Sequence, residues 1–497
     1  MKNRTHIWLF IVFLFTSFAC SDFLDEDLQG VYSSDTFYKT KEQAISALNA
    51  TYEIMAFTTI NNCLWVFGDV ASDDAIKGGN PGDQSEIEFI DAFETMPANG
   101  FVENIWQHYF AGITRANNVI HYVPDIQMDT ELKNRIIGEA KFLRAYFYFN
   151  LVNIFGEVPL KTSAILNTED LHVPVSSVED IYLRIETDLQ EATAVLPESY
   201  SASDKGRITR GGAYGLLAKT YLYQGRWPET LDAIDEIEKL ARYDLLLVYR
   251  DNFSVSYENN MESLIEIQHL SEQSPGEGSY LNQWFSPRKE NGYYFNAPVQ
   301  DLVDEYEVTG EGVVDPRLDY TIGRAGGTWL NGEPFDPAWS PTGYLGKKHV
   351  QPLSEIPSGT KGDADLNYTY MRFAEVLLMK AEALNESGST PEALDPLNRV
   401  RKRARESYIY DDTISQGGAI PANLLNDISS NDQQVVRDAI RHERRVELAM
   451  EFHRFFDLVR YGADVAEAAL ADKGFVFDEH RYFPVPQSEI DANNAIQ

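Results

Sequence analysis

The sequence has only two cysteines, Cys20 and Cys63, among its 497 residues. A disulfide framework is therefore excluded as the device that holds the chain together. Basic residues are also scarce, because 42 lysines and arginines stand against 77 aspartates and glutamates, for a formal net charge of −35. Nucleic acid is bound by cationic surfaces that release its counterions, so this charge balance argues against a nucleic-acid partner.

Hydrophobic runs long enough to span a membrane are absent as well. The apolar run at residues 7–18 follows a short basic stretch and falls below the roughly 20 residues that a spanning helix needs. It has the length of the hydrophobic region of a secretory signal, and the small residues Ser17 and Ala19 lead from it into Cys20. This end resembles a bacterial lipobox, in which Cys20 becomes the lipidated first residue of the mature chain. Ordinary signal cleavage near Ala19 is the alternative.

The residues that follow Cys20 are strongly acidic and read SDFLDEDLQG. An acidic stretch in this place resembles the surface-export signal of Bacteroidetes lipoproteins. Several acyl chains on one cysteine anchor a protein stably to a membrane. We therefore expect residues 1–19 to be a lipoprotein signal peptide and the mature protein to be a lipid-anchored, surface-exposed protein of the outer membrane.

Apolar side chains recur at helical spacing along both ends of the chain. Thr40 with Gln43, and Ser176 with Glu179, have the spacing of capping boxes that begin helices. Further helices are expected at residues 101–122, 131–154, 209–224, 227–240, 368–387, 391–405 and 432–459. The sequence therefore predicts a mainly α-helical protein.

Two of the expected helix pairs share a spacing of small, large and turn residues. The positions are Ala218, Tyr221, Gly225 and Thr230 in one pair and Ala381, Leu384, Gly388 and Ala393 in the other. Small residues let two helices approach closely, and a glycine ends the first of them. The pattern is typical of tetratricopeptide-like helical pairs, although two copies so far apart can also arise by chance.

The middle of the chain has a different composition. Residues 245–366 hold 22 glycines and prolines in 122 positions, whereas the whole chain holds 53 in 497. These residues favour turns over helices, so we expect a loop-rich insertion at 241–366 that carries the ligand site. It would separate an N-terminal helical region, 20–240, from a C-terminal one, 367–497. A smaller loop-rich region is expected at residues 57–100.

Templates for catalysis fail at a required position. His442 and Glu443 begin like the helix of a zinc protease, but Val446 stands where the second histidine is needed. Ser358 and Lys361 have the spacing of a penicillin-recognising enzyme, but the partner motifs are missing. Nucleophile-elbow, phosphate-loop and dinucleotide fingerprints are missing too. We therefore expect no enzymatic activity, no cofactor and no metal site.

A dense run of charged residues covers positions 441–460. We interpret it as a helix stabilised by ion pairs at i,i+3, such as Glu451 with Arg454 and Asp457 with Arg460. The run is therefore expected to belong to the helical frame.

The two loop-rich regions combine aromatic and charged side chains. The candidate ligand contacts are Trp65, Asp69, Asp73, Asp74 and Lys77 in the first region and Trp284, Tyr293, Tyr294, Trp329 and Trp339 in the second. Sugars present flat C–H faces that stack on aromatic rings and hydroxyls that hydrogen-bond to charged groups. These residues therefore indicate sugar binding. The alternative is that most of the rings are core residues that hold long loops in place.

Motifs along nearly the whole chain resemble, in order, those of the SusD/RagB family of Bacteroidetes outer-membrane nutrient-binding lipoproteins. They are the opening at Cys20 and the segments 68–75, 106–120, 138–145, 155–160, 207–209, 372–375, 381–385, 398–404, 443–451, 454–458 and 482–486. The resemblance implies a frame of four tetratricopeptide-like helical pairs that carries an irregular ligand-binding region, and it implies no catalysis. It also implies a partner, a SusC-like TonB-dependent outer-membrane transporter, over which the lipoprotein sits as a lid.

We therefore expect a cell-surface lipoprotein that captures oligosaccharides or polysaccharides and delivers them to this transporter. A peptide-binding RagB-type lipoprotein of the same machinery is the first alternative. A surface glycosidase and a tetratricopeptide scaffold without a small ligand are the others. A glycosidase would release reducing sugar, a peptide binder would ignore glycans, and a scaffold would show no stabilisation by either.

Overall fold

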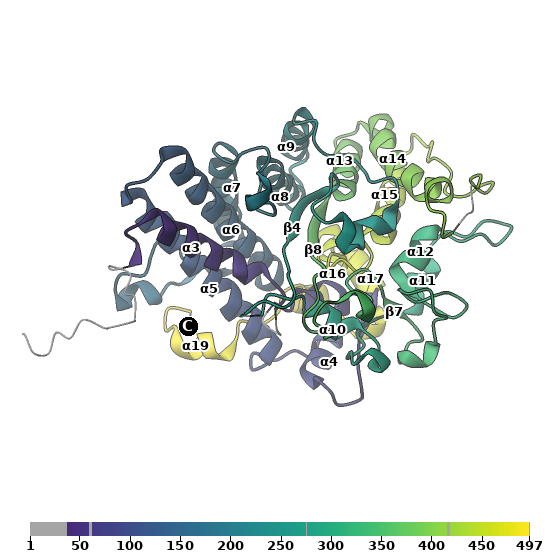
Figure 1. The fold of residues 1–497 in the computed structure, drawn as a ribbon, viewed down its shortest axis with the longest axis horizontal. Helices are drawn as coiled ribbons and strands as arrows, with labels where there is room; N and C mark the ends of the chain where they lie inside the picture. The colour runs from purple at the N-terminus through teal and green to yellow at the C-terminus, as the bar shows by residue number, and fades with distance from the viewer. Residues whose placement is uncertain (1–36, 59–61, 275, 415–417, 497) are drawn as a thin grey trace, which may run out of the picture.

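A computed structural model describes residues 37–58, 62–274, 276–414 and 418–496 of the chain. Helices dominate it, which confirms the predicted mainly α fold. The helices of the N-terminal half are α3 (Lys41–Tyr52), α4 (Ser85–Asp91), α5 (Gly100–Tyr122), α6 (Thr130–Phe155), α7 (Val178–Thr193), α8 (Arg210–Tyr223) and α9 (Trp227–Lys239). Figure 1 shows them as a purple-to-teal group that continues through α9 into the green C-terminal helices.

The helix starts follow local capping chemistry. The capping box at Thr40 is present, because its hydroxyl accepts a hydrogen bond from the backbone N–H of Gln43. The second predicted cap is wrong by one residue. Ser177 begins α7 and accepts a hydrogen bond from the N–H of Asp180.

The C-terminal half again consists mostly of helices. They are α13 (Phe373–Glu386), α14 (Thr390–Tyr410), α15 (Gln433–Leu448), α16 (Arg454–Tyr461), α17 (Ala463–Ala469), α18 (Phe477–His480) and α19 (Gln487–Ala492). The prediction of helix from residue 368 is wrong for its first five positions, which form strand β8 (Tyr368–Arg372). All five are buried, so no polar alternation marks them as a strand.

The helix predicted over 432–459 is also wrong, because it breaks in two between Leu448 and Arg454. Met450 and Phe452 adopt positive φ angles of 62° and 68°, which no helix contains. The ion pair between Asp457 and Arg460 is present at 2.8 Å. The pair predicted between Glu451 and Arg454 is not formed, because Glu451 lies outside α16 and accepts hydrogen bonds from Lys348 and Arg372.

The two helix pairs with shared spacing have the same local structure. Gly225 follows α8 with a φ of 67°, and Gly388 follows α13 with a φ of 85°. The small residues Ala218 and Ala381 are fully buried. Since α9 packs against α13, the pairs α8–α9 and α13–α14 lie next to each other although they are far apart in sequence.

Short elements replace long helices between α9 and β8. They are β4 (Ser263–Ile267), α10 (Leu281–Phe285), β5 (Phe295–Pro298), α11 (Gln300–Glu305), α12 (Pro316–Thr321), β6 (Ile322–Gly323) and β7 (Leu345–Gly346). The remaining strands are β1 (Ala75–Gly78), β2 (Val158–Pro159) and β3 (Val175–Ser176). The described strands pair antiparallel as β1–β5, β2–β3, β4–β8 and β6–β7. The exact division at residues 240 and 366 stays a prediction.

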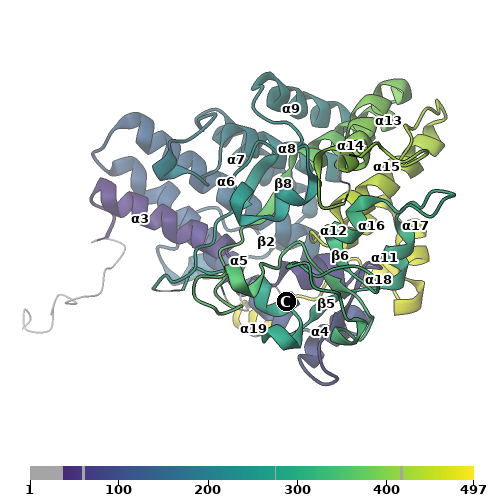
Figure 2. The same cartoon turned by 45° about the vertical axis from the view of Figure 1, so that its right-hand side comes forward.

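The β1–β5 pair joins the two loop-rich regions that the sequence indicated. Ala75 lies opposite Pro298, and Gly78 lies opposite Phe295. Two segments more than 200 residues apart therefore lie side by side next to α4, and Figure 2 shows β5 beside α4 in the lower part of the molecule.

Buried ion pairs connect strand β8 to the residues before β4 and to the end of α15. The Arg372 guanidinium donates to Glu262 at 2.7 Å, to Glu447 at 2.9 Å and to Glu451 at 2.8 Å, and all four side chains are buried. Breaking such a pair by removing one partner is costly, because it leaves a buried charge without compensation. Arg372 is thus a residue of the frame.

One of the two cysteines, Cys63, lies in the part of the chain that the structure describes. Cys63 is buried in the core with 1% of its surface exposed. Cys20 and the expected signal peptide lie outside the described residues. In the part of the chain that the structure describes, no helix has both the length and the apolar character that crossing a membrane requires.

Candidate functional site

Three of the tryptophans proposed from the sequence as sugar contacts are core residues in the structure. Trp65, Trp284 and Trp329 expose 1%, 4% and 2% of their surface. The rings of Trp65 and Trp284 pack 5.5 Å apart, and the ring of Phe285 lies edge-on to Trp65 at 5.4 Å. A sugar cannot stack on a ring whose faces are covered, so these three residues pin the loops in place.

The charged candidates of the first loop-rich region are engaged in ion pairs and hydrogen bonds. Arg454 donates to both oxygens of Asp73 at 2.7 Å. Arg445 donates to Asp74 at 2.8 Å. Burial disfavours the charged form of Asp73, but Arg454 and Arg445 outweigh it and lower the pKa of this carboxyl. These contacts tie the loop to the C-terminal helices and leave little capacity for a ligand.

Asp69 and Lys77 are also held within the fold. Asp69 accepts hydrogen bonds from the N–H of Phe452 and from the side chain of Asn296, both at 2.9 Å. Burial raises the pKa of Asp69 to about 8. The Lys77 ammonium donates to the backbone oxygen of Asp83 at 3.0 Å. Both side chains are less than a tenth exposed, so the structure gives them a positioning role beneath the loop surface.

Trp339 and Tyr294 differ from these residues, because they line a surface pocket of about 320 Å³. We call it the loop pocket. Its other lining residues are Gly79, Pro81, Arg288, Lys289, Ala338, Ser340 and Pro341. The pocket is open to solvent, and its walls come from both loop-rich regions because β1 pairs with β5. It is the place where the sequence-predicted aromatics are available to a ligand.

The Trp339 ring rests on a support of buried aromatics. The ring centroids of Trp329 and Phe335 lie 6.3 Å and 5.2 Å from that of Trp339, and each ring is inclined at 76° to it. Trp329 is itself fixed by a hydrogen bond from its indole N–H to Glu290 at 2.9 Å. Support of this kind holds the Trp339 ring in one orientation, so little conformational entropy is lost when a ligand stacks on it.

Tyr294 is held at the pocket in a strained backbone conformation. Its φ of 45° is in the left-handed region, which is uncommon for a residue with a Cβ. Its N–H donates to the carbonyl oxygen of Ser286, and its own carbonyl accepts from the N–H of Gly79, both at 3.0 Å. Strain of this kind is retained where the surroundings enforce it, often at binding sites.

The fifth aromatic candidate, Tyr293, lies beside the pocket. Its ring is edge-on to Trp284 at 5.6 Å, and its hydroxyl is 3.3 Å from that of Tyr280. It is half-buried and is not among the residues that line the loop pocket.

Two cations at the loop pocket were missed by the sequence analysis. The Lys289 ammonium lies 3.9 Å from the ring centroid of Trp339, and the Arg288 guanidinium lies 5.4 Å from that of Tyr294. Both side chains are exposed. Their position next to each other, in a loop-rich region of a strongly acidic chain, was the sequence feature that could have identified them as candidates. Lys289 also donates to Glu333, and Arg288 lies 3.8 Å from Asp83, so each cation has one carboxylate neighbour. Their remaining N–H groups are donors next to the aromatic faces, where the hydroxyls of a stacked sugar would lie.

Glu307, His442 and Glu443 come close enough together to be considered as metal ligands. Arg401 donates to Glu307 at 2.7 Å and to Glu443 at 2.9 Å, and His442 contacts Glu305 at 2.7 Å. Burial lowers the pKa of His442, but hydrogen bonds with Glu305 and Glu307 outweigh it and raise this pKa to about 9. A protonated imidazole has no lone pair for a metal, so the group is an ion-pair cluster of the frame.

Comparison with known proteins gives matches along both halves of the chain. Residues 261–497 match the family described as "SusD family", and residues 23–222 match the one described as "Starch-binding associating with outer membrane". A solved structure named as a laminarin binding SusD-like protein is 30% identical, covers 92% of this chain and 98% of its own, and superposes with a TM-score of 0.76. The chain belongs to the SusD family.

Other members of the SusD family are similar over equal lengths. SusD-like protein P2 from Formosa agariphila is 28% identical over 98% of this chain and 97% of its own. A SusD-like carbohydrate binding protein from Bacteroides fragilis is 25% identical over 93% and 100% of the two chains, with a TM-score of 0.79. The resemblance inferred from the motifs is thus confirmed. The names of these solved relatives describe carbohydrate binding, and the family is one of binding proteins rather than enzymes.

Proposed function

We propose that the protein is a cell-surface lipoprotein that binds a glycan at the loop pocket and delivers it to a SusC-like TonB-dependent transporter. The observation that carries this proposal is the presence of Trp339 and Tyr294 on one solvent-open pocket, each with an exposed cation beside it. Membership of the SusD family supports the ligand class. The pocket volume of about 320 Å³ is at the lower end of the range for small-molecule sites, roughly 300–1,000 Å³.

A sugar ring would lie against the Trp339 indole, with its C–H face toward the aromatic plane. Lys289 occupies that region and would move to donate to ring hydroxyls, which its flexible side chain permits. Arg288 and the hydroxyl of Tyr294 would meet the next unit of the chain. Aromatic stacking on a flat ligand is worth roughly 1–3 kcal/mol, so one or two such contacts account for moderate affinity.

The lipid anchor and the transporter complete the proposal. The segment at residues 7–20 has the pattern of a lipoprotein signal, so Cys20 would hold the protein in the outer membrane through its acyl chains. A lid over a transporter needs a stable interface of at least about 1,200 Å². Co-purification from native membranes should therefore recover a TonB-dependent β-barrel together with the protein.

Calorimetry on the purified mature protein tests the binding site. Laminarin oligosaccharides are the first ligands to try, because a 30% identical relative is named for binding laminarin. Trp339→Ala should weaken binding about tenfold or more, since it removes the stacking face. Tyr257→Ala, at an aromatic residue that is 48% exposed and does not line the pocket, is the matched control and should leave the affinity unchanged.

Several other neutral glucans and mannans should be titrated in the same way, together with a peptide library. Binding of a glycan that Trp339→Ala weakens would support the proposal. Selective binding of peptides, or glycan binding that Trp339→Ala leaves intact, would contradict it.

A further inference from the structure

A second pocket lies in the helical frame, where the pairs α8–α9 and α13–α14 meet. Its walls come from the turn between α8 and α9, the end of α13, the middle of α15 and the end of α16, and its volume is about 350 Å³. We call it the helix pocket. It shares no lining residue with the loop pocket, and Figures 1 and 2 place α9 at the opposite edge of the molecule from α4.

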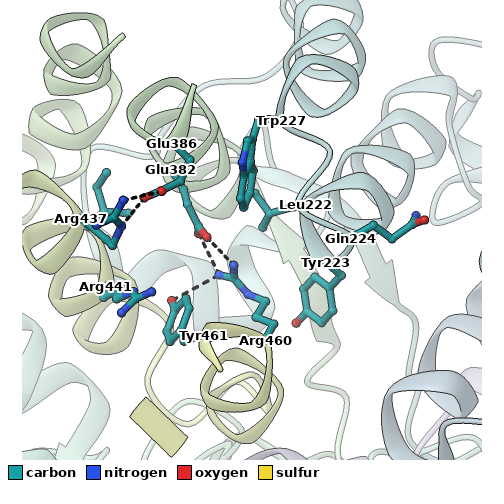
Figure 3. A pocket seen from close by; sticks show the side chains of 12 residues that line it. Leu222, Tyr223, Gln224, Trp227, Glu382, Glu386, Arg437, Arg441, Arg460 and Tyr461 are labelled. Carbon is teal, nitrogen blue, oxygen red and sulfur yellow. Dashed lines mark hydrogen bonds and ion pairs between the residues drawn. The ribbon is translucent and has the colours of Figure 1, made fainter. Parts of the chain in front are cut away.

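Two ion pairs form the polar part of the helix pocket. Arg460 donates to Glu382 at 2.9 Å, and Arg437 donates to Glu386 at 2.7 Å. Figure 3 shows both pairs as dashed lines along one wall. Each glutamate is therefore already neutralised by an arginine, and neither attracts a further cation.

Arg441 has no such partner. Among the described residues its guanidinium makes no hydrogen bond or ion pair, and it lies over the ring of Tyr461, whose centroid is 4.3 Å from the guanidinium carbon. Figure 3 shows Arg441 beside Tyr461 without a dashed line. Arg437 and Arg460 are paired with Glu386 and Glu382, and Arg460 also binds Asp457 at 2.8 Å, so Arg441 is the arginine of the pocket lining that has no carboxylate partner. An unpaired guanidinium in a hollow is a site for an anion.

Aromatic surface lies opposite this cation. Figure 3 shows Trp227 on the side of the pocket away from Tyr461, with the Glu382–Arg460 pair between the two rings. Trp227 is half-buried, because α9 begins there at the edge of the helix pair. A ligand that reaches both groups would therefore lie over the Glu382–Arg460 pair, with the indole at one end and the Arg441 guanidinium at the other.

We propose that the helix pocket binds one acidic sugar unit, whose carboxylate or sulfate pairs with Arg441 while its ring lies against Trp227. A guanidinium donates two parallel hydrogen bonds to such an oxyanion, which fixes both position and orientation. The indole supplies the face on which the C–H side of a sugar stacks. A neutral sugar lacks the first interaction and should bind there weakly. The proposal does not depend on the loop pocket, since the two pockets lie on different elements.

The test is calorimetry at low ionic strength with two acidic ligands, a glucuronate-containing disaccharide and a sulfated disaccharide. Their neutral counterpart is titrated as well, at up to about 10 mM, so that millimolar dissociation constants are detected. The variant is Arg441→Gln, which removes the charge from a side chain without polar partners and so should fold normally. The matched control is Arg481→Gln, because Arg481 also lies over aromatic rings but is outside both pockets.

We expect at least one acidic disaccharide to bind the parent protein and Arg481→Gln with the same affinity. Its dissociation constant for Arg441→Gln should be about tenfold higher or more. Which acidic ligand binds distinguishes a carboxylate site from a sulfate site. Trp339→Ala should leave this binding unchanged. The proposal for the loop pocket and the proposal for the helix pocket can therefore fail independently of each other. The proposal is overturned if neither acidic disaccharide binds, if Arg441→Gln binds as tightly as the parent, or if an acetylated dipeptide with a free carboxylate binds equally well.

Discussion

At the scale of single residues, the same side-chain type serves two different purposes in this protein. Trp65 is 1% exposed and contacts Trp284, Phe285 and Phe295, so its ring contributes to the core. Trp339 lies on a pocket open to solvent, and its ring is supported from behind. The difference lies in what covers each ring, and residue type alone does not determine it.

Trp65→Ala should therefore act on stability. Replacing a fully buried tryptophan by alanine removes its packing and leaves a cavity, which typically costs about 3–5 kcal/mol in unfolding free energy. Urea denaturation monitored by circular dichroism measures this loss. Trp339→Ala is the comparison and should cost much less. Equal, small losses for both variants would contradict the assignment of Trp65 to the core.

Burial also explains which candidates the sequence could identify. The loop-rich regions and their aromatic content followed from composition, and Trp339 and Tyr294 were among the candidates chosen on that basis. Both line the loop pocket. The burial of Trp65 and Asp69 did not follow from composition, because it results from contacts with segments more than 200 residues away, such as Phe295 and Phe452. No local pattern reports those contacts.

At the scale of elements, helix positions followed from apolar spacing, and the exceptions have tertiary causes. α5, α6, α8, α9 and α14 begin and end within a few residues of their predicted limits, apart from the last turn of α14. The break between α15 and α16 occurs where Phe452 is held by Asp69 and by the backbone at Gly68. A helix continuing through this point would lose both contacts.

Gly68→Ala tests this break. Gly68 belongs to a π-helical turn at Val66–Val70, and a Cβ there would lie 2.7 Å from the Cα of Phe452 and closer still to its carbonyl. Because backbone atoms cannot yield as a side chain does, the unfolding free energy should fall by about 3 kcal/mol or more. Gly310→Ala is the matched control, since nothing lies within 4 Å of its added Cβ. Thermal denaturation of the two variants should separate them clearly, and similar melting temperatures would argue against the contact.

The stability that His442 on α15 contributes through Glu305 and Glu307, at and just after the end of α11, should depend on pH. Hydrogen bonds with Glu305 and Glu307 outweigh burial and raise the pKa of His442 from 6.5 to about 9, with Arg445 also bound to Glu305. A raised pKa in the folded state means that this stabilisation is complete below pH 6.5 and is lost as the pH rises to about 9. Unfolding free energies measured across this window should decline in the parent. His442→Gln should flatten the decline, whereas His172→Gln, at an exposed histidine, should not.

At the scale of the whole molecule, the net charge limits the ways in which the protein can attach to a membrane. A net charge of −35 favours repulsion from anionic lipid surfaces, so an electrostatic association with a membrane is disfavoured. The proposed attachment is therefore covalent lipid at Cys20, which does not depend on the charge of the protein.

Cys20→Ala should give a folded protein that leaves the membrane. Fractionation of cells followed by a high-salt wash measures this, because salt removes proteins held only by charge. The parent should stay in the membrane fraction, and the variant should appear in the soluble fraction with an unchanged melting temperature. Cys63→Ser is the comparison at the other cysteine and should remain attached wherever it folds. Retention of Cys20→Ala in washed membranes would contradict the lipid anchor.

The central claim is that a glycan binds at the loop pocket without being cleaved. A crystal structure of the protein with the oligosaccharide that binds most tightly in calorimetry tests it most directly. We predict an intact sugar chain with one ring stacked on Trp339 and the next unit near Tyr294 and Arg288. Sugar bound only elsewhere while Trp339 and Tyr294 stay uncovered, or a shortened product in the pocket, would contradict the claim.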